Sequence, residues 1–164
     1  MYTSTWMMGG FDALDDTAKS RIVFEMVSAL IIIDMCEIRR IPQLSPKTNP
    51  QAPTLYDLFD MGRVKYAFQK PQDDWKDVVT VLQTGCGSCN SLAAFRCAEL
   101  QLRGVDARPY VDAQMDNPQM DGTLLDVFHV SVQIFDEEGN PTNEFEDPSI
   151  ELGMPDPDGQ AVQS

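Results

Sequence analysis

The sequence predicts one α+β domain, and three observations point to that class. Apolar residues recur every three or four positions over Thr17–Arg40 and again over Cys89–Arg103, as in helices packed on a core. After Gly104 apolar and polar residues alternate, as in strands with one buried face. A chain of 164 residues, 43% of them hydrophobic, also buries a core large enough to fold without disulfides. We therefore expect an N-terminal helix and a second helix packed on a small antiparallel sheet.

The first helix is expected to span Thr17–Arg40. Asp15 or Asp16 can cap its first amide groups, and Pro42, which has no amide donor, ends it. The aliphatic residues exceed a single stripe along this helix, so we expect it to be buried on more than one side. Cys36 would then be a buried, structural cysteine.

Four prolines between positions 42 and 53 exclude regular structure from the next stretch, because each removes a backbone donor. We expect residues 42–54 to form an extended, Pro-rich arm that lies on a surface. A short segment at Leu55–Met61, a strand at Val64–Phe68 and a helix end or short strand at Trp75–Leu82 should follow. The expected organisation is a helical segment (1–41), the arm (42–54), a core (55–154) and a flexible acidic tail (155–164), all within one domain.

The second helix is expected to begin at Cys89, directly after Gly85-Cys86-Gly87-Ser88, and to end at Gly104. Glycine is common at that point because it adopts the left-handed backbone conformation that closes many helices. Cys97 lies on the same face as Cys89, two four-residue steps further along the helix. We therefore expect Cys97 in the core.

Three strands are expected after the second helix, at Ala107–Ala113, Val127–Phe135 and Thr142–Glu146. The turn sequence Asp136–Pro141 separates the last two, so they can pair as a hairpin. His129 lies within the second strand, and Asp147 follows the third. An overhang or bulge in the hairpin would bring these two side chains together.

The net charge of −14 is concentrated in the C-terminal third. Residues 1–108 hold 13 acidic and 12 basic residues, whereas residues 109–164 hold 13 acidic residues and no basic one. Binding to nucleic acid or to an anionic membrane surface needs clustered lysine and arginine, so neither is an expected partner. The surplus carboxylates should favour the imidazolium form of His129 and attract basic partners.

The N-terminus lacks the basic start and the long apolar run of a signal peptide, and no apolar stretch is long enough to cross a bilayer. We therefore expect a cytoplasmic protein that is not secreted. In that reducing compartment its four cysteines should be free thiols. They are Cys36, Cys86, Cys89 and Cys97.

Cys89, His129 and Asp147 have the residue types of a cysteine nucleophile with its general base. A cysteine at a helix N-terminus is favoured as the thiolate, because unpaired amide groups and the helix dipole stabilise negative charge. A histidine facing the sulfur would complete a thiolate–imidazolium pair, and a carboxylate behind the histidine would fix its ring. These three residues are therefore the candidate catalytic residues.

Four short motifs resemble those of transglutaminase-like proteins, in the same order along the chain. They are Gly87-Ser88-Cys89-Asn90-Ser91-Leu92-Ala93, Arg103-Gly104-Val105-Asp106-Ala107-Arg108, Phe128-His129-Val130-Ser131-Val132 and Asp147-Pro148-Ser149. The resemblance covers residues 80–150. It implies a papain-like cysteine fold, in which the helix with the nucleophile packs on an antiparallel sheet with the histidine and aspartate. Members include cross-linking acyltransferases, cysteine proteases, amidases and inactive binding proteins, so the resemblance implies a protein or peptide substrate.

A narrower resemblance is to small phage-encoded transglutaminase-like proteins. The stretches Leu92–Leu100 and Glu146–Met154 are among those that carry it. That group usually has acidic residues around its cysteine, where this chain has Ser88, Asn90 and Ser91. The resemblance implies a protein of the host cytoplasm or of the virion.

Two other interpretations remain open. A phage protein of this fold can be a non-catalytic structural or assembly component, whose partners are neighbouring virion subunits. Cys86-Gly87-Ser88-Cys89 also has the CxxC spacing of thiol–disulfide redox proteins, although that interpretation leaves His129 and Asp147 without a role. The CxxC has no second ligand pair of standard zinc-site spacing, and the sequence contains no calcium-loop motif, so we expect neither a metal nor a cofactor.

Overall fold

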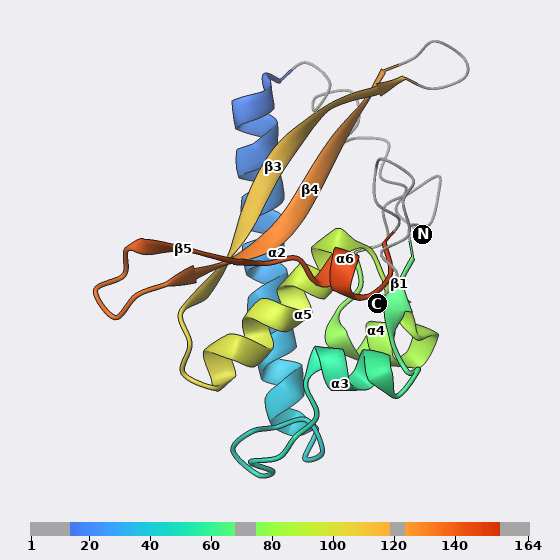
Figure 1. Cartoon of the computed structure of the whole chain (residues 1–164), viewed down its shortest axis with the longest axis vertical. Coiled ribbons are helices and arrows are strands. Elements are labelled where there is room, and N and C mark those ends of the chain that lie inside the picture. The colour runs from blue at the N-terminus through green and yellow to red at the C-terminus, as the bar shows by residue number, and fades with distance from the viewer. Residues whose placement is uncertain (1–13, 68–74, 119–123, 155–164) are drawn as a thin grey trace.

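The structure, a computed structural model, describes residues 14–67, 75–118 and 124–154. Helices α2 and α5 pack against each other and against a three-stranded antiparallel sheet (Figure 1). The helices are α2 (Asp16–Arg40), α3 (Leu55–Asp60), α4 (Val78–Thr84), α5 (Cys89–Leu102) and α6 (Pro148–Glu151). The strands are β1 (Lys65–Tyr66), β2 (Cys86–Gly87), β3 (Ala107–Pro118), β4 (Leu124–Phe135) and β5 (Pro141–Glu146). The expected α+β class is confirmed, with an N-terminal helix and the Cys89 helix on a small antiparallel sheet.

Helix α2 forms as the sequence predicts, but it is buried on one side only. Asp15 caps it by accepting a hydrogen bond of 2.7 Å from the amide of Ala18. Ile32 is 64% and Ile33 48% exposed, and Cys36 is exposed as well. The prediction that α2 is buried on more than one side, with Cys36 inside, is therefore wrong. Among the described elements α2 packs against α4, α5 and β3. One face of the helix makes these contacts, and the aliphatic side chains on its other face are exposed to water.

Two acidic side chains of α2 hold the start of α4. Asp34 is fully buried and accepts a hydrogen bond of 2.8 Å from the amide of Val78. Glu37, one turn further along α2, accepts one of 3.4 Å from the amide of Val79. The first amides of a helix have no partner within that helix, so these carboxyl groups satisfy them. Through these contacts α2 positions the helix that leads into β2.

Residues 42–54 form a series of turns rather than an extended arm. The amide of Asn49 donates to the carbonyl of Ser45 at 2.8 Å, and the amide of Ala52 donates to the carbonyl of Asn49 at 2.9 Å. Leu44 and Ala52 are buried. Short polar residues between the prolines close turns locally, which the proline spacing alone does not reveal.

Helix α5 is enclosed on all sides, since residues 89–100 are all buried. Gly87 precedes it, and a Cβ there would lie 3.1 Å from the side chain of Leu92, so the entry into the helix is closely packed. Beyond its end Gly104 has a φ of 88°, the left-handed conformation expected of it. The short parallel pair β1–β2 holds the segment in front of the helix.

The strand order in the main sheet is β3–β4–β5, and β4 extends past the end of β5. Val132 of β4 pairs with Glu146 of β5, and the register of this pair shifts further along. Asp147 comes next after Glu146 and therefore lies beside the stretch of β4 that holds His129. The hairpin thus has both the overhang and the irregularity that the sequence requires.

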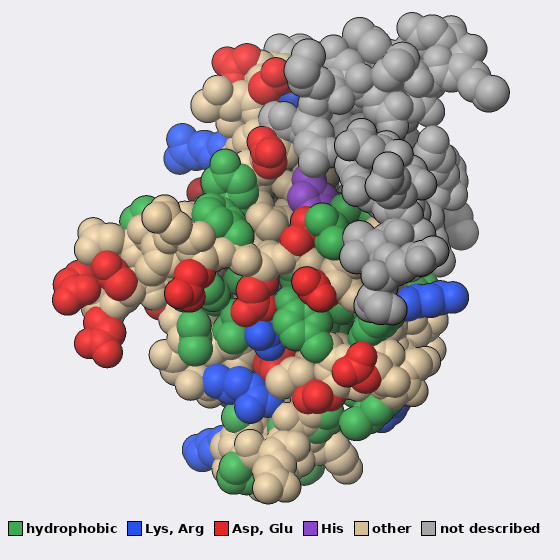
Figure 2. Space-filling model, in the orientation of Figure 1, with side chains coloured by type: hydrophobic (Ala, Val, Ile, Leu, Met, Phe, Trp, Pro, Cys, Tyr) green, Lys and Arg blue, Asp and Glu red, His purple; other side chains and the backbone are tan. Residues whose placement is uncertain are grey.

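The core lies where α2, α5 and the sheet meet. Val27, Leu92, Val130 and Val132 are fully buried there. Acidic side chains are spread over the face seen in Figure 2, and the single histidine is visible at its surface. Within the described residues no helix has the length and the apolar character that crossing a membrane would need.

Candidate active site

Cys89 is the first residue of α5, at the point where the helix meets β4. The residue is 8% exposed. Its Sγ lies 3.6 Å from Oδ1 of Asn90 and 3.9 Å from the carbonyl oxygen of Phe128 on β4. Since Phe128 directly precedes His129, the sulfur is close to the strand that carries the histidine.

Asp147 is held by the helix that follows it and faces His129. Its Oδ2 lies 2.5 Å from Nε2 of His129. Its Oδ1 accepts hydrogen bonds from the amides of Ser149 at 3.0 Å and Ile150 at 3.3 Å, because Asp147 caps α6. Pro148 suits the first position of that helix, where no amide donor is needed. One carboxylate oxygen is therefore fixed by the backbone and the other is presented to the imidazole.

The surroundings of His129 favour its charged form. The hydrogen bond with Asp147, followed by the nearby side chain of Cys89, raises its pKa from 6.5 to about 10, although burial acts in the opposite direction. Burial tends to raise the pKa of Asp147, but its hydrogen bond and ion pair with His129 hold that pKa below the ordinary value. The shift has the direction expected from acidic surroundings, but among the described carboxylates only Asp147 contributes to it, and the other described acids of the C-terminal third do not.

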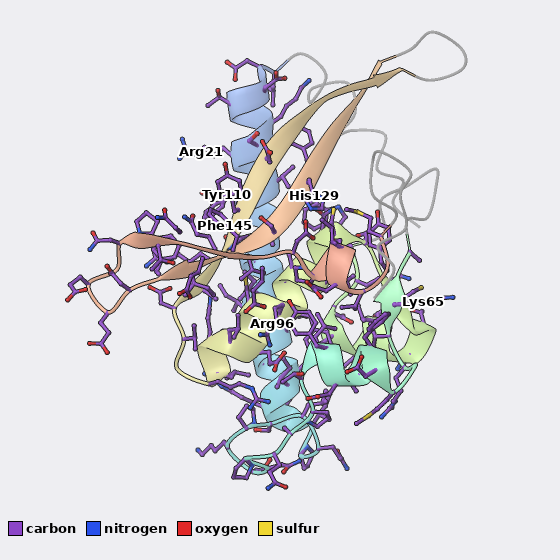
Figure 3. All side chains as sticks on the ribbon, viewed as in Figure 1. Arg21, Lys65, Arg96, Tyr110, His129 and Phe145 are labelled. Carbon is purple, nitrogen blue, oxygen red and sulfur yellow. The ribbon has the colours of Figure 1, made fainter. Side chains whose placement is uncertain are left out.

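The three residues predicted from the sequence come together in the structure. Asp147 hydrogen-bonds His129, and the sulfur of Cys89 lies 3.9 Å from the carbonyl oxygen of Phe128, the residue directly before His129. Figure 3 shows His129 on β4 next to the short helix α6. The arrangement can supply a nucleophilic sulfur, a proton donor and a carboxylate that orients it.

A group of charged and aromatic side chains ties α5 to the end of β5. The Nε of Arg96 lies 2.6 Å from Oε2 of Glu146, and another of its nitrogens lies 3.1 Å from Oε1. The hydroxyl of Tyr56 donates to Oε2 of Glu146 at 2.8 Å, and the guanidinium lies 4.6 Å from the centre of the Tyr56 ring. Arg96 also contacts Glu99 at 3.1 Å. Figure 3 shows Arg96 within the body of the molecule.

This group was not predicted from the sequence. Glu146 directly precedes Asp147, so its position bears on that of the site carboxylate. The signal present in the sequence is a pair of charged residues, Arg96 and Glu99, inside a helix that otherwise carries core residues. Buried charges are rare unless they are paired, so such residues predict partners elsewhere in the chain.

The four cysteines have different surroundings, and all are free thiols. Cys97 is fully buried, as expected. Cys86 is also buried, and its Sγ lies 3.5 Å from Nζ of Lys76. Within the described part of the chain, no three His, Cys, Asp or Glu side chains are grouped so that they could hold a metal ion.

No protein-family model matches the chain, and no curated protein does. It is similar to the crystal structure of the periplasmic domain of TgpA from Pseudomonas aeruginosa bound to ethylmercury, with a TM-score of 0.40 and 18% identity. The match covers 81% of this chain and 45% of the TgpA chain, so this chain spans less than half the length of the TgpA chain. A likeness of that size leaves the family to be argued from motifs and site geometry.

Proposed function

We propose that this chain is a transglutaminase-like cysteine protein of the small phage-encoded type, which acts on amide bonds as a thiol protease, amidase or acyltransferase. The observation that carries the proposal is the hydrogen bond between Asp147 and His129, beside a Cys89 sulfur that lies against the backbone of Phe128, the neighbour of His129. The motif resemblance around these residues supports the family. The protein or peptide that it acts on would come from the host cytoplasm or the virion.

The first step is attack of the Cys89 thiolate on the carbonyl carbon of the amide. The carbon–nitrogen bond breaks as the imidazolium of His129 gives its proton to the leaving amine, and a thioester remains on the sulfur. The amide of Cys89 is among the first of α5, which have no partner within the helix, and it would donate to the developing oxyanion.

The second step decides between the two classes of product. Water attacks the thioester in hydrolysis, and a primary amine attacks it in acyl transfer. Either nucleophile gives its proton to neutral His129, and the sulfur leaves as the thiolate. Asp147 stabilises the imidazolium each time it forms, while α6 keeps the carboxylate in place.

The replacement of acidic residues near the cysteine is compatible with this proposal. Ser91 has a packing role, since its hydroxyl accepts a hydrogen bond of 2.8 Å from the amide of Lys76. Asn90 lies against the sulfur. Neither residue is needed for the proton transfers described above.

The proposal is tested with a labelled protein substrate and a primary-amine probe, using the Cys89→Ala variant as the negative control. Cys36→Ser is the matched positive control, because Cys36 is an exposed thiol outside the site. Release of peptides, or incorporation of the amine, that is lost only in Cys89→Ala supports the proposal. Equal signals from all three proteins, or none from any, would count against it.

A second candidate is a non-catalytic virion structural or assembly protein. The observation in its favour is the exposed pair Ile32 and Ile33 on α2, which suits contact with another subunit. This function predicts a fixed copy number of the protein in purified particles, and assembly that tolerates Cys89→Ala. A reversible disulfide between Cys86 and Cys89 would instead favour the redox interpretation.

A further inference from the structure

We propose that a groove at the C-terminal end of α5 binds a segment of a partner polypeptide that carries large apolar side chains next to lysine or arginine. The groove is separate from the candidate active site. Helix α5 has 14 residues, which corresponds to about 21 Å from Cys89 to its last turn. The inference therefore does not depend on the chemistry proposed for Cys89.

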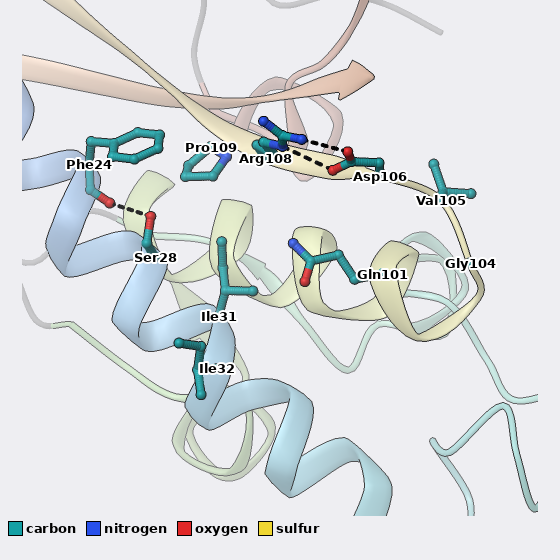
Figure 4. Close-up of a pocket in the computed structure, with 10 residues that line it drawn as sticks. All are labelled: Phe24, Ser28, Ile31, Ile32, Gln101, Gly104, Val105, Asp106, Arg108 and Pro109. Carbon is teal, nitrogen blue, oxygen red and sulfur yellow. Dashed lines mark hydrogen bonds and ion pairs between the residues drawn. The ribbon is translucent and has the colours of Figure 1, made fainter. Parts of the chain in front are cut away.

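The apolar part of the groove is a cavity of about 510 Å³ between α2 and the start of β3 (Figure 4). Phe24, Ile31 and Ile32 line it from α2, and Pro109 lines it from β3. Gln101 and the loop after α5 lie between them. These side chains come from three separate segments, so the cavity is a product of the fold and not of one loop.

Apolar side chains of this part remain in water. Phe24 is 38% and Ile32 64% exposed. Exposed apolar area is unfavourable in water, and large apolar residues clustered in a groove mark interaction sites. A partner that covers Phe24 and Ile32 would remove that unfavourable exposure.

The acidic part of the groove is a second cavity of about 340 Å³ at the turn between β4 and β5. It shares Gly104, Val105 and Asp106 with the first cavity, so the two adjoin the same loop. Its remaining lining residues belong to β4 and the turn. They are Phe135, Asp136, Glu137, Glu138 and Gly139.

The two parts of the groove differ in charge and therefore favour different side chains of a partner. Arg108 lies between them, but its guanidinium contacts Asp106 at 2.7 and 3.0 Å and lies 4.0 Å from the centre of the Phe135 ring. The positive charge of Arg108 is thus balanced locally. Asp136, Glu137 and Glu138 form no ion pair with another described residue. They make one end of the groove anionic.

These observations select one kind of occupant. Large apolar side chains fit against α2, and a lysine or arginine fits against the carboxylates of the turn. An acidic segment would be repelled at the anionic end. A purely apolar segment would leave those carboxylates unpaired.

The test is a binding titration followed by fluorescence anisotropy. The probe is a labelled synthetic peptide with leucine at every third or fourth position and a run of lysines at one end. We expect Ile32→Ser, and separately the double variant Glu137→Lys/Glu138→Lys, to weaken binding by a factor of about ten or more, equivalent to about 1.4 kcal/mol. The double variant should instead bind the same peptide with glutamates in place of the lysines.

Matched controls separate the groove from general stickiness. Ile33→Ser removes a neighbouring exposed isoleucine, and Glu144→Lys an exposed acid of the same hairpin, and neither residue lines the groove. Both should bind as the unchanged protein does. Equal losses in the controls, or no loss in the groove variants, would overturn the proposal.

Sedimentation of the unchanged protein and the Ile32→Ser variant distinguishes a second copy of this chain from a different partner. A self-association that Ile32→Ser abolishes would mean that another copy fills the groove, and would overturn the assignment. In the groove variants, iodoacetamide should alkylate Cys89 at the same rate as in the unchanged protein. Failure of the active-site proposal would therefore leave this test intact.

Discussion

Arg96 of the helix that begins with Cys89 binds both oxygens of Glu146, at 2.6 and 3.1 Å, one residue before Asp147. The contact joins the segment that carries the sulfur to the segment that carries the carboxylate. It is well shielded, since the side chain of Arg96 is 11% and that of Glu146 30% exposed. The geometry of the site thus depends on an ion pair outside it.

We predict that Arg96→Met destabilises the fold and disturbs the site. Removal of one member of a buried ion pair leaves the other charge uncompensated, which costs about 3–5 kcal/mol of unfolding free energy. Tyr56→Phe is the milder comparison, because it removes only the hydrogen bond of 2.8 Å to Glu146 and should cost about 1 kcal/mol. Denaturant unfolding of the two variants checks both values. Equal, small losses of unfolding free energy in the two variants would show that the Arg96–Glu146 pair does not anchor β5.

A second prediction concerns the titration of His129. It is the only histidine in the chain, so its imidazole resonances need no assignment by mutation. We expect a pKa of about 10 in the unchanged protein, and a lower pKa in Asp147→Asn, because the variant removes the negative partner. Asparagine also caps helices, so α6 should persist in the variant. An ordinary pKa in the unchanged protein would be the contrary result.

The same pair predicts how stability depends on pH. The folded pKa of His129 lies above its ordinary value of 6.5, so the stabilisation is complete below pH 6.5 and is lost as the pH rises through 10. The pKa of Asp147 is lowered, so its contribution is lost only on acidification below the ordinary value of 3.8. His129→Gln should remove part of the alkaline loss. Unfolding free energies of the unchanged protein and of His129→Gln, measured from acidic to alkaline pH, test this. The same alkaline loss in both proteins would contradict the prediction.

Asp34 provides a fourth prediction. Burial raises its pKa from 3.8 to about 8, against the hydrogen bond from Val78, and its Oδ2 has no hydrogen-bond partner. Its contribution to stability is present below pH 3.8 and is lost as the pH rises through 8. Asp34→Asn keeps an acceptor for Val78 without a charge, so above pH 8 it should be more stable than the unchanged protein by a few kcal/mol, on the order of one per pKa unit. Thermal unfolding at pH 6 and pH 9 tests the sign: a variant less stable at both would contradict it.

Local patterns and the motif resemblance together predicted the three candidate site residues, each of which lies at the end of an element or within one with a clear period. Cys89 follows a glycine turn, His129 lies in an alternating strand, and Asp147 precedes a proline. The cap that Asp147 provides for α6 was not predicted, since the helix has only four residues. Short helices leave almost no periodicity to detect.

Long-range contacts explain what the sequence did not reveal. Arg96 and Glu146 are 50 residues apart, and nothing local identifies one as the partner of the other. The exposure of Ile32 and Cys36 depends on how many layers cover α2, which composition does not determine. In both cases the missing information lies in how the elements pack.

The central claim is that His129, held by Asp147, activates Cys89, and its most direct test is the rate at which each cysteine is alkylated. Iodoacetamide is added near neutral pH, and the modified cysteines are identified by mass spectrometry over time. Cys89 is 8% exposed, whereas Cys36 is exposed, so access alone predicts that Cys36 reacts first. The proposed site predicts that Cys89 reacts faster than Cys36 and Cys97, and that His129→Gln abolishes this advantage. If Cys36 reacts first, and the rate of Cys89 is the same with and without His129, the claim is contradicted.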